Sequence, residues 1–150
     1  MTIKSMNNKP LKLGLIGGAH SSAVGYTHWC ASQLDNRWQV TSGCFSRDLD
    51  RSVETGSVWG LEQSACYSDW QRYIDEKKRD VDAMCVLTPT PDHVDIVCRL
   101  LENNIPVICE KAMAASLSQS LKIKQALKVK RIPSYCIKKG MEQIKDEDYQ

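Results

Sequence analysis

The sequence lacks any C-x-x-C pair, although it contains seven cysteines in 150 residues. The cysteines are dispersed, and most lie inside apolar runs, where a free thiol behaves as a small hydrophobic side chain. This pattern is typical of neither a disulfide scaffold nor a zinc site, so we expect no bound metal. Since no secretory signal is visible either, the unpaired thiols indicate a reducing compartment, and we expect a cytoplasmic protein.

Long apolar runs and a strong charge imbalance are also absent. No run approaches the roughly 18 apolar residues of a membrane span, and residues 1–10 are polar, unlike a signal peptide. The net charge is only +2, far below the basic excess of most nucleic-acid-binding proteins. We therefore expect neither a membrane nor a nucleic acid as a partner.

What the sequence does contain is an alternation of apolar and amphipathic segments over the length of about one domain. Strands are expected at residues 11–16, 38–45, 81–88 and 105–109, and helices at 23–34, 47–57, 70–78, 91–103 and 116–130. Strands alternating with helices in this way predict a parallel sheet covered on both sides. The expected fold is α/β, a doubly wound parallel sheet of Rossmann type in a single three-layer domain.

The predicted domain covers residues 11–130. Residues 1–10 are expected to form a disordered lead-in, and residues 131–150 an atypical tail in which 134–138 could add a short edge strand. An uncovered sheet edge favours self-association, so a homodimer is one expected arrangement.

Two of the predicted helices allow their buried sides to be named in advance. In the helix at 91–103 an apolar stripe at i, i+3, i+4 and i+7 is formed by Val94, Val97, Cys98 and Leu101. An asparagine, Asn103 or Asn104, is expected to end that helix in the left-handed conformation. In the helix at 116–130 the residues expected to face inward are Leu117, Leu121 and Ala126.

The first strand ends directly in Gly17 and Gly18, which let the backbone pass close to a pyrophosphate. The amides of residues 20–22 would then point at the phosphates from a helix N-terminus, and Gly25 would let that helix pack against the sheet. Ala19 stands where the usual G-x-G-x-x-G pattern has a glycine. The alternative is a tight turn that binds no ligand.

The second strand ends in Phe-Ser-Arg-Asp, where a site for NAD usually has an acid that holds the ribose hydroxyls. Ser46 and Arg47 fit a 2′-phosphate, so the cofactor is expected to be NADP or NAD, with NADP slightly favoured. The alternative is that Ser46 or Asp48 caps the next helix while Arg47 is solvated.

Two further polar segments follow strands, at the sheet edge where ligands of open α/β folds bind. His93, in the first, could contact a cofactor or form only local hydrogen bonds at the start of a helix. Lys111, in the second, could orient a substrate hydroxyl or stabilise developing negative charge, or it could be a surface lysine.

The three segments together, at residues 13–25, 88–93 and 109–114, resemble the N-terminal domain of the glucose–fructose oxidoreductase, inositol dehydrogenase and rhizopine-catabolism (Gfo/Idh/MocA) family. The second segment, T-P-T-P-D-H, is similar to that family's T-P-N-x-x-H, with a threonine for the asparagine. The third, C-E-K-A-M-A, is similar to C-E-K-P-L-A, with alanine and methionine replacing proline and leucine. The resemblance covers roughly residues 11–128.

The resemblance implies reversible hydride transfer between a nicotinamide dinucleotide and a carbinol carbon of a sugar or cyclitol. It implies that Lys111 lies beside the reacting centre as the catalytic candidate of this chain. The cofactor-binding residues that it implies are Gly17, Gly18, His20, Ser21 and Ser22 at the pyrophosphate, Ser46 and Arg47 at the ribose, Thr88, Pro89 and His93 at the nicotinamide, and Glu110 and Lys111 beside it.

Members of the family continue into a second domain that carries most substrate contacts and the usual catalytic histidine. Residues 131–150 show no family pattern, so we expect a truncated chain with little or no dehydrogenase activity by itself. The alternative function is a non-catalytic module that binds a nucleotide or another protein.

Overall fold

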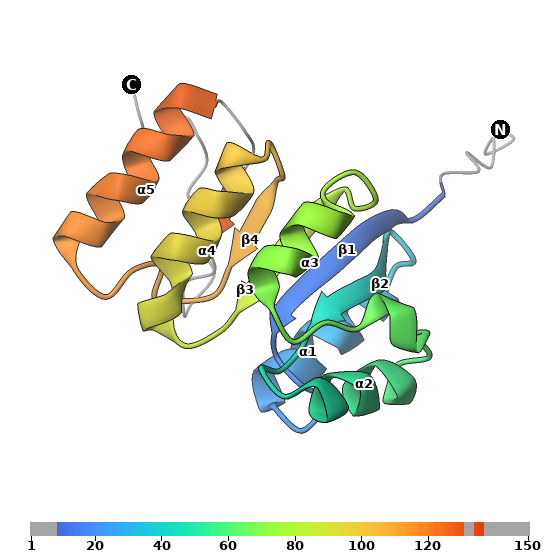
Figure 1. Ribbon diagram of the computed structural model, residues 1–150. Helices are drawn as coiled ribbons and strands as arrows, with labels where there is room; N and C mark the ends of the chain where they lie inside the picture. The colour runs from blue at the N-terminus through green and yellow to red at the C-terminus, as the bar shows by residue number, and fades with distance from the viewer. Residues whose placement is uncertain (1–8, 131–133, 137–150) are drawn as a thin grey trace, which may run out of the picture.

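The structure is a computed structural model that describes residues 9–130 and 134–136. The predictions made for residues 1–8, 131–133 and 137–150 lie outside these described residues. Figure 1 shows one twisted sheet with helices packed on both of its faces. Among the described residues, no helix is long and apolar enough to cross a membrane.

The sheet has five parallel strands in the order β2-β1-β3-β4-β5. The strands are β1 (Leu11–Gly17), β2 (Trp38–Cys44), β3 (Ala83–Leu87), β4 (Val107–Cys109) and β5 (Ser134–Cys136). The helices are α1 (Ala23–Gln33), α2 (Leu49–Val58), α3 (Trp70–Lys77), α4 (Thr90–Glu102) and α5 (Leu117–Lys130), with a short 3-10 turn at Gln63–Ala65. The Rossmann-type α/β fold predicted from the alternation of strands and helices is confirmed.

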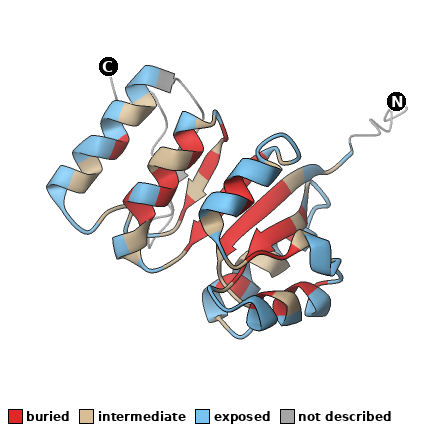
Figure 2. Ribbon diagram, in the orientation of Figure 1, coloured by how far each residue is buried: buried red, intermediate tan, exposed pale blue. Residues whose placement is uncertain are grey.

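Two apolar clusters, one on each face of the sheet, make the three layers. Side chains alternate along a strand, so Leu15 and Cys85 enter one cluster while Ile16 and Val86 enter the other. The first cluster lies under α1 and α2, and the second under α3, α4 and α5. Figure 2 shows the resulting band of buried residues along the central strands. This double burial explains why the strands read as nearly continuous apolar runs.

Polar residues at the expected positions set the helix ends. The Asp69 carboxylate accepts a hydrogen bond from the Arg72 amide and caps α3. Asn104 has a φ of 59°, which confirms the left-handed residue expected after α4. On α4, Val94, Val97 and Leu101 are buried as expected, while Cys98 is only half-buried.

The prediction for the inward side of α5 was wrong for both leucines. Leu117 and Leu121 are exposed, and Ile123 is buried in their place. Ala126, the third predicted residue, packs against the core beside Leu127. Positions 123, 126 and 127 also follow the i, i+3, i+4 spacing, so the sequence offers two competing apolar stripes. Packing against α4 selects the one that contains isoleucine.

One buried pair of hydroxyls ties β2 to α3. The Ser42 hydroxyl lies 2.9 Å from the Tyr73 hydroxyl, and both residues are buried. Burial raises the pKa of Tyr73, so the phenol stays protonated. Gly14 makes room for this pair, because a Cβ at that position would overlap the Tyr73 hydroxyl.

We predict that Tyr73→Phe destabilises the protein by about 1–3 kcal/mol, because it leaves the buried Ser42 hydroxyl without this partner. Urea unfolding of Y73F, S42A and the double variant measures the coupling between the two side chains. The double variant should lose less than the two single losses added together. Strict additivity would show that the hydroxyl pair contributes nothing.

Candidate functional site

The carboxyl ends of β1 and β3 lie next to each other, where Gly17 pairs with Leu87. From this point the chain leaves β1 toward β2 on one side of the sheet, and leaves β3 toward β4 on the other. Connections that diverge in this way open a crevice at the strand ends, the usual place of ligands in doubly wound sheets.

A cavity of about 580 Å³ lies at this point, within the range of about 300–1,000 Å³ typical of ligand sites. The carboxyl ends of β1, β2 and β3 all contribute to its wall. Of the predicted site residues, those that line it are Gly17, Gly18, Ser46, Arg47, Thr88 and Pro89. The others predicted, His20, Ser21, Ser22, His93, Glu110 and Lys111, do not line this cavity.

The turn after β1 is built so that only glycine fits. Gly17 and Gly18 have φ values of +82° and +72°, in the region that side chains rarely adopt. A Cβ on Gly17 would lie 2.8 Å from the Thr88 amide nitrogen, and one on Gly18 would lie 2.6 Å from a methyl carbon of Leu87. The cavity wall therefore consists of bare backbone at Gly17 and Gly18. A ligand can approach the main chain closely at this point.

Helix α1 begins immediately beyond this turn and packs against it. A Cβ on Gly25 would overlap the Gly18 carbonyl oxygen, so the predicted close approach of the helix is present. The Ser22 hydroxyl caps α1 by accepting from the Gly25 amide. The His20 ring nitrogen Nδ1 lies 3.1 Å from Thr55 Oγ1, which ties the turn to α2, while Ser21 is exposed.

The structure shows which contacts Ser46, Arg47 and Asp48 make at the end of β2. Asp48 caps α2, and the Ser46 hydroxyl accepts a hydrogen bond from the Asp48 amide. The Arg47 side chain is mostly solvated, with 82% of its surface exposed, and its guanidinium also donates to the Asp92 carboxylate at 2.8 Å. Asp92, at the start of α4, was not singled out from the sequence.

Thr88 carries an unsatisfied polar atom into the cavity wall. Its hydroxyl oxygen is buried and has no hydrogen-bond partner among the described residues. A buried hydroxyl without a partner costs about 1–3 kcal/mol. Because this oxygen is shielded from the cavity, the feature that suits a polar ligand along the strand ends, as a dinucleotide would be, is the bare glycine turn.

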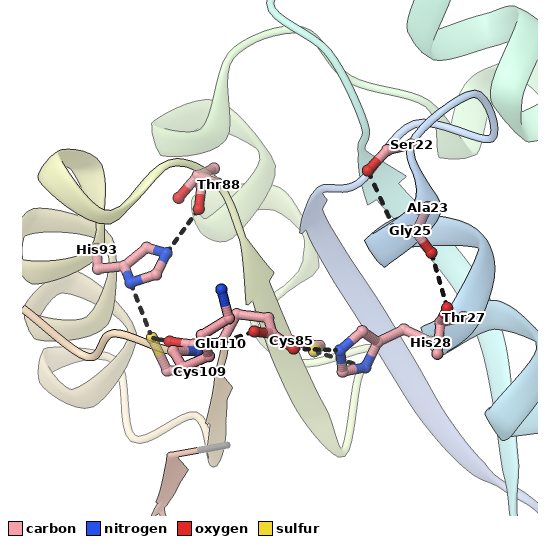
Figure 3. A network of polar contacts seen from close by, with 11 residues as sticks. Ser22, Ala23, Gly25, Thr27, His28, Cys85, Thr88, His93, Cys109 and Glu110 are labelled. Carbon is pink, nitrogen blue, oxygen red and sulfur yellow. Dashed lines mark hydrogen bonds and ion pairs between the residues drawn. The ribbon is translucent and has the colours of Figure 1, made fainter. Parts of the chain in front are cut away.

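His93 lies behind this wall and is fully buried. Its Nε2 is 2.7 Å from the Thr88 carbonyl oxygen (Figure 3), and its Nδ1 is 2.8 Å from the Ala112 carbonyl oxygen. A neutral ring donates to one of these oxygens and a protonated ring to both. Both ring nitrogens thus face backbone carbonyl oxygens. The ring joins the loop after β3 to the loop after β4.

Glu110 follows β4 and is held from two directions. Its Oε1 accepts from His28 Nε2 at 3.2 Å, and its Oε2 accepts from the Lys111 amide at 3.0 Å. The Lys111 side chain is exposed. His28 was missed in the sequence, although it lies three residues after Gly25, hence on the same side of α1 that packs toward the sheet.

The thiols near the site are unreactive. Cys44 lines the cavity, and burial raises its pKa to about 12, so it stays protonated near neutral pH. Burial also raises the pKa of Cys85 on β3. Across residues 9–130 and 134–136, no three His, Cys, Asp or Glu side chains gather as metal ligands.

Comparison with known proteins adds a family assignment to this geometry. A family model described as an oxidoreductase family with an NAD-binding Rossmann fold matches residues 11–132. The chain is 32% identical over 121 residues to the uncharacterized oxidoreductase YfiI of Bacillus subtilis, covering 78% of this chain and 31% of that protein. It is 28% identical over 121 residues to inositol 2-dehydrogenase 4 of Saccharopolyspora erythraea, covering 81% and 34%.

Among solved structures, an inositol dehydrogenase homolog from Azotobacter vinelandii, complexed with NADH and myo-inositol, superposes with a TM-score of 0.80. The sequence identity is 25%, over 85% of this chain and 35% of that protein. The chain thus spans about a third of the length of the relatives it matches.

We predict that Thr88→Val stabilises the ligand-free protein by about 1 kcal/mol, because it removes the buried hydroxyl that lacks a partner and keeps the side-chain shape. The free energy of urea unfolding is the measurement, with Thr55→Val as control, since the Thr55 hydroxyl donates to the Arg51 carbonyl oxygen. A loss of stability in T88V as large as that in T55V would contradict the assignment of Thr88 as an orphan.

Proposed function

The chain belongs to the Gfo/Idh/MocA oxidoreductase family, and from that premise we propose that residues 11–130 bind a nicotinamide dinucleotide in the cavity at the ends of β1, β2 and β3. The observation that carries this proposal is the bare glycine turn in the cavity wall, where a Cβ on Gly17 or Gly18 would collide with the end of β3 and where backbone lies open to a ligand.

The proposed placement follows the strand ends. The pyrophosphate lies along the glycine turn, where backbone amides and the N-terminus of α1 favour a negative charge. The adenosine ribose lies at Ser46 and Arg47, and the nicotinamide lies past Thr88 and Pro89. His93 supports this wall from behind, through its contact with the Thr88 carbonyl oxygen.

We further propose that the activity is hydride transfer to or from a carbinol carbon of a sugar- or cyclitol-like substrate. When bound, the nicotinamide supplies the hydride acceptor or donor. Lys111, exposed beside Glu110, orients the substrate hydroxyl and stabilises negative charge on its oxygen. Support comes from the relatives named as inositol dehydrogenases. Since the chain spans a third of their length, we propose that most substrate contacts lie outside residues 11–130.

For the choice of cofactor we propose NADP over NAD. Ser46 and Arg47 offer a hydroxyl and a guanidinium at the ribose end, and a guanidinium suits a phosphate well. The pairing of Arg47 with Asp92 opposes this preference, because the carboxylate competes with the 2′-phosphate for the guanidinium. The balance between these two residues sets the preference.

Calorimetric titration of the 150-residue chain with NAD(H) and NADP(H) tests the proposed function. We predict that the chain binds at least one pair and that Gly18→Ala abolishes binding, because the added Cβ meets Leu87 and fills the turn. Gly60→Ala is the matched control: Gly60 also has a positive φ, but open space around it, so this variant loses some stability and keeps its affinity.

Arg47→Ala, which changes a mostly exposed side chain at the cavity, serves if G18A does not fold, and it should weaken NADP binding about tenfold. Absence of binding of all four nucleotides up to millimolar concentration would refute the proposed function.

We predict opposite effects from the two residues of the ribose end. Arg47→Ala should weaken NADP binding about tenfold more than NAD binding, because only NADP has the phosphate to pair. Asp92→Asn should strengthen NADP binding, because it frees the guanidinium of Arg47. The measurement is the dissociation constant of each variant for NAD and for NADP. Equal effects on the two nucleotides would show that the 2′-phosphate of NADP does not bind at Arg47.

A further inference from the structure

Lys111 stands between two residues that are each held by a histidine from another part of the fold. Glu110 is bound by His28 from α1 (Figure 3), and the carbonyl of Ala112 is bound by His93 from α4. The three loop residues lie at the end of a strand of only three residues. The backbone bonds to β3 end with the Glu110 amide, which donates to the Val86 carbonyl oxygen, so side-chain contacts fix the peptide beyond it that carries Lys111.

The contact with His28 has the polarity needed to hold a carboxylate. Burial raises the pKa of Cys85, so its sulfur keeps its proton and can donate to His28 Nδ1, 3.7 Å away. The proton of a neutral imidazole then lies on Nε2, which donates to Glu110 Oε1. Cys85 therefore donates to His28, and His28 donates to the Glu110 carboxylate.

Glu110 passes this restraint to the main chain of Lys111. With Oε1 engaged by His28, Oε2 faces back and accepts from the Lys111 amide at 3.0 Å. The side chains of His28 and Glu110 are mostly shielded, with 18% and 16% of their surface exposed, so water competes weakly for either partner. Without His28, the carboxylate would be free to rotate away from that amide.

We infer that His28 is a positioning residue for Lys111, acting through the Glu110 carboxylate. The inference rests on the proposed function in one respect, that Lys111 is the group that meets the substrate. Helix α1 then acts at two places in the proposed site. Its N-terminus faces the phosphates, and His28, further along the helix, orients the loop after β4 that carries Lys111.

Amide hydrogen exchange in the full 150-residue chain, measured by NMR without nucleotide, tests the inference. In His28→Ala the Lys111 amide should exchange about tenfold faster, because Glu110 no longer holds it. In His28→Gln the side-chain amide supplies a donor in place of Nε2, and the protection should return. The Lys12 amide, which donates to the Asp82 carboxylate at 2.7 Å on the other side of the protein, is the internal control.

Equal acceleration at Lys111 and Lys12 in H28A would show general destabilisation and overturn the inference, as would unchanged exchange at Lys111. Failure of H28Q to restore protection would also overturn it. The calorimetric titration stays a separate measurement. If no dinucleotide binds, the proposed function fails regardless of exchange. If a dinucleotide binds and the Lys111 amide exchanges equally in H28A and in the unaltered chain, only the role of His28 fails.

Discussion

The close approach of two backbones, at Gly18 and Gly25, determines the layout of this protein. Because neither residue has a Cβ, the first turn of α1 rests directly on the turn after β1. The position of α1 follows from that contact, and with it the direction of its N-terminus and the depth at which His28 meets β3 and Glu110. A side chain at either glycine would push α1 outward. The helix N-terminus would then move away from the turn after β1, and His28 would move away from Glu110.

Polar groups at the strand ends divide into two kinds. Most serve the fold: the Ser22, Asp48 and Asp69 side chains cap helices, and His93 joins two loops through backbone carbonyls. Among the described side chains that line the cavity, the guanidinium of Arg47, which is mostly exposed and shared with Asp92, keeps the clearest capacity for a ligand. A rigid frame with few unengaged groups is what a site for an extended, charged ligand requires, because the frame does not have to reorganise when the ligand enters.

The sequence was sufficient for those features that depend on neighbouring residues. Apolar runs, glycines and the asparagine pair placed β1, β3, the glycine turn and the end of α4 close to where the structure has them. It was insufficient where distant packing decides. Which apolar stripe of α5 faces inward depends on the surface of α4. Local spacing alone permits either the stripe with Leu117 and Leu121 or the stripe with Ile123. The partners of Glu110 and Arg47, which are His28 and Asp92, come from other elements and 82 and 45 residues away, so no local pattern shows them.

The strand order also has a kinetic consequence. The first of the described strands, β1, lies inside the sheet. Its two neighbours form from segments that differ greatly in distance along the chain, since Leu13 pairs with Val40 on one side and with Ala83 on the other. During synthesis one edge of β1 can pair early, while the other stays open until β3 has emerged. An apolar strand with an open edge is a target for wrong partners. Folding that must wait for distant pairing is slow, so the interval in which this chain is most prone to aggregate falls before β3 pairs.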